Sequence, residues 1–173
     1  ADNYPELFDI ARATEWIEGA AEAAEWFEKE DVIHWRLIPD YEDYYYPDAP
    51  GYKATGRYLT GEPIDGIMLG DSRKLLIAAP HWPVGITYEE MFEWGGVSAR
   101  DRWNIDVMNA RKVADTLTFG QGIAAWFVKG VFDRSIDVYT EQPVTSILTE
   151  NESVIGVRSE AASGSIDLYG QVV

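Results

Sequence analysis

The sequence predicts an α+β fold in two parts: a helical, loop-rich region over residues 1–118 and a helix with a small β-meander over residues 119–173. Three observations lead to this prediction. Apolar side chains recur at helical spacing near the start of the chain. Prolines and glycines punctuate residues 39–66. Short alternating runs, separated by turn residues, fill the last forty positions. The change of character near residues 115–120 marks the boundary.

The first element is a long amphipathic helix. Asn3, Pro5 and Glu6 have the spacing of a capping box with a proline in the first turn. Glutamates occupy most of the polar side, and the alanine-rich apolar face is typical of a scaffold helix that packs closely on a neighbour. The residues of that face are Leu7, Ile10, Thr14, Ile17, Ala21, Ala24 and Phe27.

Residues 32–38 alternate as a strand does, with His34 interpreted as a structural residue. Residues 39–66 then form a long predicted loop, and its segment of residues 40–48 contains four tyrosines, Tyr41 and residues 44–46. Aromatic side chains favour burial, and long loops in compact domains are usually functional when they are ordered. The tyrosine segment is therefore a candidate site.

Two capped helices follow. Thr87 and Glu90 have capping-box spacing for a short helix that runs through Phe92. Ser98 and Asp101 have the spacing of a second cap, for a helix that continues to Leu117.

Residues 120–125 read Gly-x-Gly-x-x-Ala, and Glu141 follows about twenty residues later, as in a dinucleotide-binding turn. That turn needs a buried strand directly before the first glycine, whereas residues 109–117 read as the end of a charged helix. We therefore favour a helix N-terminus with glycines for close packing. This helix is predicted to end near Arg134.

The remaining residues predict β-structure. A strand is expected over residues 136–140, followed by a three-stranded meander over residues 144–149, 154–159 and 166–169.

The net charge, the apolar content and the absence of cysteine exclude several classes of function. The 173 residues carry a net charge of −16, and fourteen of the 30 acids lie in residues 1–50. Such a surface repels phosphate backbones and anionic membranes, so we expect no nucleic-acid partner. No apolar run is long enough for a membrane span. The absence of cysteine excludes disulfides and thiolate chemistry, and a cytoplasmic location is the simplest assumption.

The tyrosine-rich loop of residues 40–51 and the segment of residues 133–157 together carry a family resemblance. The latter contains the runs Asp-Arg-Ser-Ile-Asp-Val, Thr-Glu-Gln-Pro-Val-Thr-Ser-Ile-Leu and Val-Ile-Gly-Val. They resemble the flavoproteins of the fumarate reductase and 3-ketosteroid dehydrogenase group, and the loop is more similar to the ketosteroid dehydrogenase branch.

The resemblance implies a substrate cap followed by part of an FAD-binding domain. It implies catalytic roles for Tyr44 and Tyr45 beside a second, basic tyrosine, and cofactor-binding positions at Val144, Gln121 and Gly122. The substrate would be a small apolar molecule such as a steroid. The aromatic residues Trp82, Tyr88, Phe92, Trp94 and Trp103 would line its site.

No glycine-rich phosphate loop stands before residue 1, so we expect an internal fragment of an FAD-dependent oxidoreductase. Its parent protein would hold FAD, and the remainder of the flavin domain would be its partner. The isolated chain is expected to be inactive and not to bind FAD tightly, and exposed apolar surface could support a homo-oligomer.

Two alternatives stay open at this point. One is a fragment of a fumarate or succinate-type flavin reductase, which would need arginine and histidine at the substrate carboxylates. Here Arg100 and Arg102 are the candidates. The other is a non-catalytic, aromatic-rich module that binds a ligand. We expect no metal site, because the acids of residues 40–48 lack the order and the glycine of a calcium loop.

Overall fold

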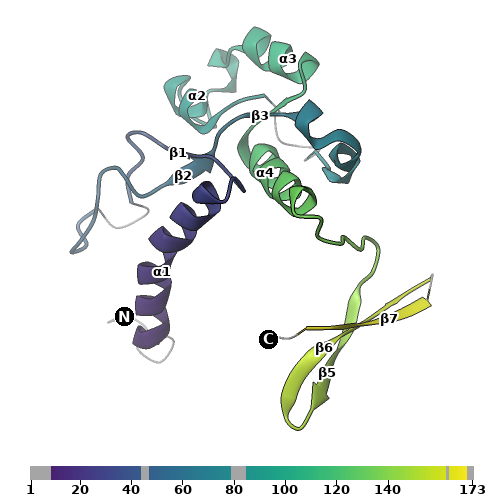
Figure 1. Ribbon diagram of the computed structural model, residues 1–173. Coiled ribbons are helices and arrows are strands. Elements are labelled where there is room, and N and C mark those ends of the chain that lie inside the picture. The colour runs from purple at the N-terminus through teal and green to yellow at the C-terminus, as the bar shows by residue number, and fades with distance from the viewer. Residues whose placement is uncertain (1–8, 44–46, 79–84, 163, 171–173) are drawn as a thin grey trace. The chain divides into compact units, whose positions relative to one another are not determined.

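The computed structural model in Figure 1 describes residues 9–43, 47–78, 85–162 and 164–170. Contacts divide the chain into two compact units, Ala1–Ser135 and Ile136–Val173, and each is described here by itself. Helices with small antiparallel sheets confirm the predicted α+β class. The predicted boundary after residue 118 separates a substrate-cap-like region from a segment of the flavin domain. The contacts do not test that functional division, so it stays a prediction.

Helix α1 spans Ile10–Lys29. Its N-cap is Asp9, whose Oδ1 accepts hydrogen bonds from the backbone of Ala11 at 3.0 Å and Arg12 at 3.1 Å. The predicted cap at Asn3 lies outside the described residues. Arg12 leaves much of its side chain in solvent, as do most residues of α1, and the helix carries no buried residue.

Two short antiparallel ribbons follow. Strand β1 (Trp35–Leu37) pairs with β2 (Leu59–Gly61), and β3 (Ile64–Asp65) pairs with β4 (Thr116–Leu117). The prediction of an unbroken loop over residues 39–66 is therefore wrong. Strands of two or three residues are too short to give an alternating pattern, and their partners come from elsewhere in the sequence.

The helices between β3 and the second unit are η2 (Gly66–Leu75), α2 (Tyr88–Glu93), η3 (Arg100–Arg102), α3 (Ile105–Val113) and α4 (Phe119–Asp133). The Thr87–Glu90 capping box of α2 is confirmed. The predicted cap at Ser98 is wrong, because α3 starts later and Asn104 Oδ1 accepts the Val107 N–H at 3.1 Å.

The core of the first unit lies where α4 crosses the ribbons. Buried Trp126 donates from Nε1 to the Glu62 carbonyl at 2.8 Å, so the ring that fills the core also fixes the backbone between β2 and β3. This cluster consists of Ile33, Ile64, Leu69, Leu117, Ala125 and Trp126. A second cluster joins α2 and α3 through Ile86, Met91, Trp103 and Met108.

The second unit is an antiparallel sheet in the order β5-β6-β7, from Val144–Glu150, Ser153–Ala161 and Gly164–Tyr169. The predicted meander is confirmed. The predicted strand over residues 136–140 is wrong: its residues alternate, but they pair with no described strand. The buried Ser159 hydroxyl lies 2.9 Å from the Pro143 carbonyl oxygen, which ties the entry of the sheet to β6.

Candidate functional site

The two ends of the tyrosine loop are held together by reciprocal hydrogen bonds. The Asp43 N–H donates to the Lys53 carbonyl at 2.9 Å, and the Lys53 N–H donates to Asp43 Oδ2 at 2.9 Å. Arg57 joins the same closure, with Nη1 2.9 Å from Asp43 Oδ2 and Nη2 donating to the Gly51 carbonyl at 2.8 Å. The candidate residues Tyr44 and Tyr45 fall inside this closed loop but lie outside the described residues.

Tyr52, in the same loop, is held by a hydrogen bond from its hydroxyl. Its hydroxyl donates a short hydrogen bond to the Glu42 carboxylate. This bond, with a smaller contribution from burial, raises the pKa of Tyr52 to about 12. A phenol that holds its proton so firmly is a poor general base near neutral pH. Tyr52 therefore closes the loop and is not a candidate for proton abstraction.

An aromatic cluster connects this loop to α2 and to the start of α4. The ring of Tyr41 lies edge-on to Tyr58, with centroids 4.6 Å apart, and to Phe92, at 4.9 Å. Tyr88 stacks on Phe119 with centroids 4.1 Å apart and an interplanar angle of 10°. Tyr41 also meets Tyr88 edge-on at 6.4 Å, so the rings form a continuous chain. The loop and the first residue of α4 are thereby brought to one side of the first unit.

Gly122 is buried against the strand before α4. A Cβ added there would lie 3.0 Å from the Leu117 carbonyl oxygen, and the Gly122 N–H donates to the Thr118 carbonyl at 2.9 Å. The strand before the helix, β4, pairs antiparallel with β3, whereas a dinucleotide-binding turn follows a strand of a parallel sheet. The glycine thus allows close packing of helix on strand.

Gln121 is half-buried and lines a small cavity of about 140 Å³ at the start of α4. One wall is the ion pair of Arg73 and Asp115, with Arg73 Nε 2.9 Å and Nη2 2.8 Å from the carboxylate oxygens. The hydrogen bond from Arg73 lowers the pKa of Asp115. Lys112 completes the charged part of the lining.

This cavity is too small for a dinucleotide. Pockets that hold drug-sized ligands occupy roughly 300–1,000 Å³, against about 140 Å³ here. The residues around Gln121 fit one small group at most. The described part of the first unit therefore does not enclose FAD at the start of α4.

Val144 begins β5 in the second unit, opposite Ser159, with 59% of its surface exposed. It stands directly after Pro143, whose carbonyl is held by the Ser159 hydroxyl. The first and second units are described separately, so no distance joins Val144 to Gln121 or Gly122. The cofactor role of these three positions stays a prediction.

The aromatic residues expected to line a substrate site divide between core and surface. Trp103 is buried in the second cluster and donates from Nε1 to the Gly96 carbonyl at 3.2 Å, so it belongs to the core. Tyr88 and Trp94 pack partly buried against that cluster. Phe92 is exposed, and Trp82 lies outside the described residues.

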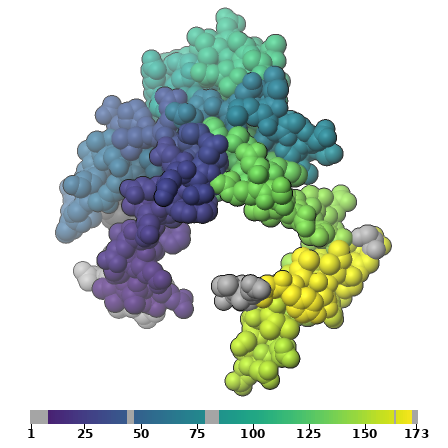
Figure 2. Space-filling model, in the orientation of Figure 1, coloured from purple at the N-terminus to yellow at the C-terminus, as the bar shows by residue number. Residues whose placement is uncertain are grey.

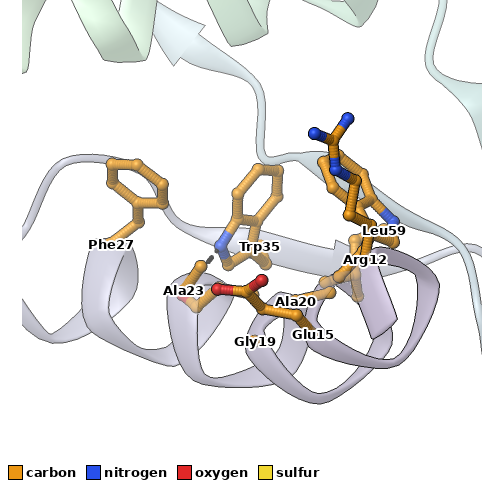
Figure 3. Close-up of a pocket in the computed structure, with 10 residues that line it drawn as sticks. Arg12, Glu15, Gly19, Ala20, Ala23, Phe27, Trp35 and Leu59 are labelled. Atoms are coloured by element: carbon orange, nitrogen blue, oxygen red, sulfur yellow. Dashed lines mark hydrogen bonds between the residues drawn. The ribbon is translucent and has the colours of Figure 1, made fainter. Parts of the chain in front are cut away.

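A larger apolar groove, which the sequence did not predict, runs along α1. It has a volume of about 650 Å³ and lies between α1 and the β1–β2 ribbon. In Figure 3, Phe27, Trp35 and Leu59 stand along the helix above its small residues. Trp35 is anchored by a hydrogen bond from Nε1 to the Ala24 carbonyl at 3.1 Å. The remaining lining residues are Arg12, Glu15, Trp16, Gly19, Ala20 and Ala23.

The described residues also bear on metal binding and on membrane insertion. No group of three or more histidine, aspartate or glutamate side chains among them could hold a metal ion. Within the same ranges, every helix is too short or too polar to cross a bilayer.

The sequence model of the protein family described as FAD binding domain matches residues 4–169. The chain belongs to this family. FAD is therefore the cofactor of the parent protein, and the predicted resemblance to this group of flavoproteins is confirmed. No curated protein sequence matches the chain.

A solved structure has a similar fold: the 3-ketosteroid delta1-dehydrogenase from Sterolibacterium denitrificans, in complex with 1,4-androstadiene-3,17-dione. The TM-score is 0.76 at 20% sequence identity. The match covers 91% of this chain and 32% of that structure, so the chain spans about a third of its length.

Proposed function

We propose that the chain is part of an FAD-dependent dehydrogenase that oxidises a steroid-like ketone. Residues 1–118 would serve the substrate side, and residues 119–173 would belong to the flavin domain. Family membership over residues 4–169 and the likeness to a ketosteroid dehydrogenase support this proposal. The observation that carries it is the closed tyrosine loop, whose ends at Asp43 and Lys53 are hydrogen-bonded beside an aromatic cluster.

The proposed reaction forms a carbon–carbon double bond next to the ketone. When bound, FAD would accept the hydride from one carbon. A tyrosinate would take the proton from the neighbouring carbon, and the electron pair of that C–H bond would become the new π bond. Tyr44 or Tyr45 would assist this base. Tyr52 is disfavoured for this role, because its hydroxyl already donates to the Glu42 carboxylate.

FAD would be held by the longer protein rather than by this chain alone. Val144, Gln121 and Gly122 would each contribute part of the contact surface. The small size of the cavity beside Gln121, about 140 Å³, supports a shared cofactor site.

The first test of this proposal is FAD binding by the purified 173-residue chain. Absorbance between roughly 350 and 500 nm reports bound flavin, and quenching of flavin fluorescence reports added FAD. We expect neither for this chain and both for a longer protein that contains it. Tight binding by the chain alone would show that it holds a complete flavin site, and the shared site would be rejected.

The second test is tyrosine substitution in the flavin-loaded longer protein, with a 3-ketosteroid as substrate and a dye as electron acceptor. The substitution, Tyr44→Phe or Tyr45→Phe, that removes the hydroxyl assisting the base should lower kcat, by up to the roughly 10²–10⁴-fold that acid–base catalysis contributes. Tyr52→Phe is the matched control within the loop and should change kcat much less. Equal losses in all three variants would indicate a structural role for the loop.

The fumarate-type alternative receives less support. It needs arginines that are free to bind a dicarboxylate, and several described arginines already pair with acids, as Arg36 does with Glu89 at 3.3 Å. Arg100 lies over the Trp103 ring at 5.8 Å, in the packing of the second cluster.

A further inference from the structure

Helix α1 presents an apolar face that the described part of the first unit does not cover. Trp16 is 78% exposed, and Ile10 and Ile17 are each 72% exposed. Of the helix, Phe27 is the residue that packs against the main core. Helices in proteins draw most of their stability from packing of such a face, so a 20-residue helix with no buried residue points to a missing neighbour. Figure 2 shows α1 in purple as a continuous stretch of surface.

The shape of the groove on this face suits the packing of another helix or strand. Its floor is made of the small residues Gly19, Ala20 and Ala23, which let a neighbouring backbone approach closely. Its walls are the aromatic rings of Trp35 and Phe27. The hydrogen bond from Trp35 Nε1 to the Ala24 carbonyl, at 3.1 Å, fixes one wall in place. An exposed apolar groove of this size marks an interaction site in a folded protein.

The charges around the groove disfavour a second copy of the chain. Outside the apolar face α1 is strongly acidic, and its basic residues are Arg12 and Lys29. Two such helices placed side by side would repel each other. The acidic residues are Glu15, Glu18, Glu22, Glu25 and Glu28. The occupant is therefore an apolar element with a neutral or basic rim.

We propose that the groove between α1 and the β1–β2 ribbon is the surface on which the rest of the FAD-binding fold packs. This inference rests on the proposed function, which places the chain in a longer flavoprotein. The chain spans 32% of the solved dehydrogenase with the similar fold, so about two thirds of that fold has no counterpart here. An apolar helix or strand from that portion would bury Trp16 and close the groove.

The test uses cysteine labelling, which is clean in this chain because it contains no cysteine of its own. Ala20→Cys places a thiol on the groove floor, and Ala11→Cys places one on the opposite side of α1, about two and a half helical turns away, as a matched control. Both positions are exposed in the first unit. A thiol reagent is applied to the 173-residue chain and to the longer protein, and labelling at each position is measured by peptide mass spectrometry.

We expect both thiols to react at similar rates in the 173-residue chain. In the flavin-loaded longer protein, Ala20→Cys should react about tenfold or more slowly, because labelling would need local opening of a packed surface. Ala11→Cys should keep its rate in both.

Equal labelling of the two thiols in a flavin-loaded protein would overturn the packing proposal and leave the proposed function intact. A longer protein without flavin absorbance would contradict the proposed function itself. Protection of Ala20→Cys in the 173-residue chain would also overturn the packing proposal. If it grew with protein concentration, a second copy would be the occupant; otherwise another part of the same chain would cover the groove.

Discussion

Among the described residues, the buried hydrophobic side chains all lie in the first unit, most of them in the clusters around Trp126 and Trp103. In the second unit the buried residue is Ser159, a polar one, while Ile147 and Tyr169 are 64% and 69% exposed. The first unit is therefore held by packing between segments distant in sequence. The second is held by backbone pairing between consecutive strands.

This difference indicates how far the stability of each unit depends on contacts outside it. A sheet needs a covered apolar face for independent stability, and small isolated β-structures are marginal in water. The ion pair of Arg158 and Asp167, with two contacts of 2.7 Å, supports the β6–β7 pairing but leaves both faces of the sheet largely open. The second unit is thus the part expected to gain most from a larger fold.

The largest expected effect comes from removing the centre of the first core. Trp126→Ala should lower the free energy of unfolding by about 3–5 kcal/mol, the usual cost of a buried tryptophan truncation. All seven tryptophans lie in residues 1–135, so tryptophan emission during urea unfolding monitors this unit alone. Ile147→Ala, in the second unit, should leave that transition unchanged. A shift of the same size in both variants would show that the units unfold together.

The second prediction compares the stability contributed by an ion pair of the first unit with that of an ion pair of the second unit. Glu90 accepts from Arg111 at 2.5 and 2.7 Å, and both side chains are mostly buried, at 19% and 25% exposure. Arg111→Met should therefore cost about 1.5–3 kcal/mol, as expected for hydrogen bonds to charged groups. Arg158→Met removes a more exposed pair and should cost less. Urea unfolding at neutral pH measures both, with tryptophan emission for the first unit and circular dichroism for the second.

The same pair predicts an acid dependence. Burial alone would raise the pKa of Glu90, but hydrogen bonds from Arg111 and from the Thr87 backbone outweigh it, so the pKa lies below its ordinary value of 4.5. A lowered folded pKa means that the contribution is complete above the unfolded value and is lost as the pH falls through the folded one. Stability of the first unit should decline in that window. The Arg111→Met variant should decline less, and an unchanged acid profile would refute the assignment to this pair.

The elements that the sequence predicted correctly are those with local causes. The Thr87–Glu90 capping box and the three strands of the meander depend on residues within a few positions of one another. Strands β2, β3 and β4 were missed because their pairing joins distant segments, as Ile64 and Leu117 do. The run at residues 136–140 alternates as a strand does, yet a strand also needs a partner, which no local pattern reports.

The features of the candidate site also divide into one that the sequence marks locally and one that only the fold creates. Composition alone marked the tyrosine loop, because four tyrosines among prolines and glycines are unusual. The groove on α1 needed the fold, since it exists where Trp35 and Leu59 of the ribbon meet the small residues of the helix. One sign of this groove is present in the sequence, the alanine-rich face of the first helix, which predicts close packing on a neighbour.

The smallest expected effect distinguishes the two glycines at the start of α4. Replacing either glycine by alanine within a helix gains about 0.5–1 kcal/mol of backbone entropy when space allows. Space is open at Gly120, where an added Cβ meets nothing within 4 Å, so Gly120→Ala should be neutral or slightly stabilising. At Gly122 the added Cβ would lie 3.0 Å from the Leu117 carbonyl oxygen, which belongs to paired backbone and cannot move freely.

Gly122→Ala should therefore be destabilising by about 1 kcal/mol or more, as overpacking usually is. Because both variants gain the same kind of helix entropy, the difference between their unfolding midpoints isolates the contact of α4 with β4. Equal stabilisation by both substitutions would mean that Gly122 is not required for packing. The flavin titration of each variant in the longer protein would then decide whether the second glycine serves the cofactor instead: a loss of FAD affinity in Gly122→Ala without a loss of stability assigns it to the cofactor site.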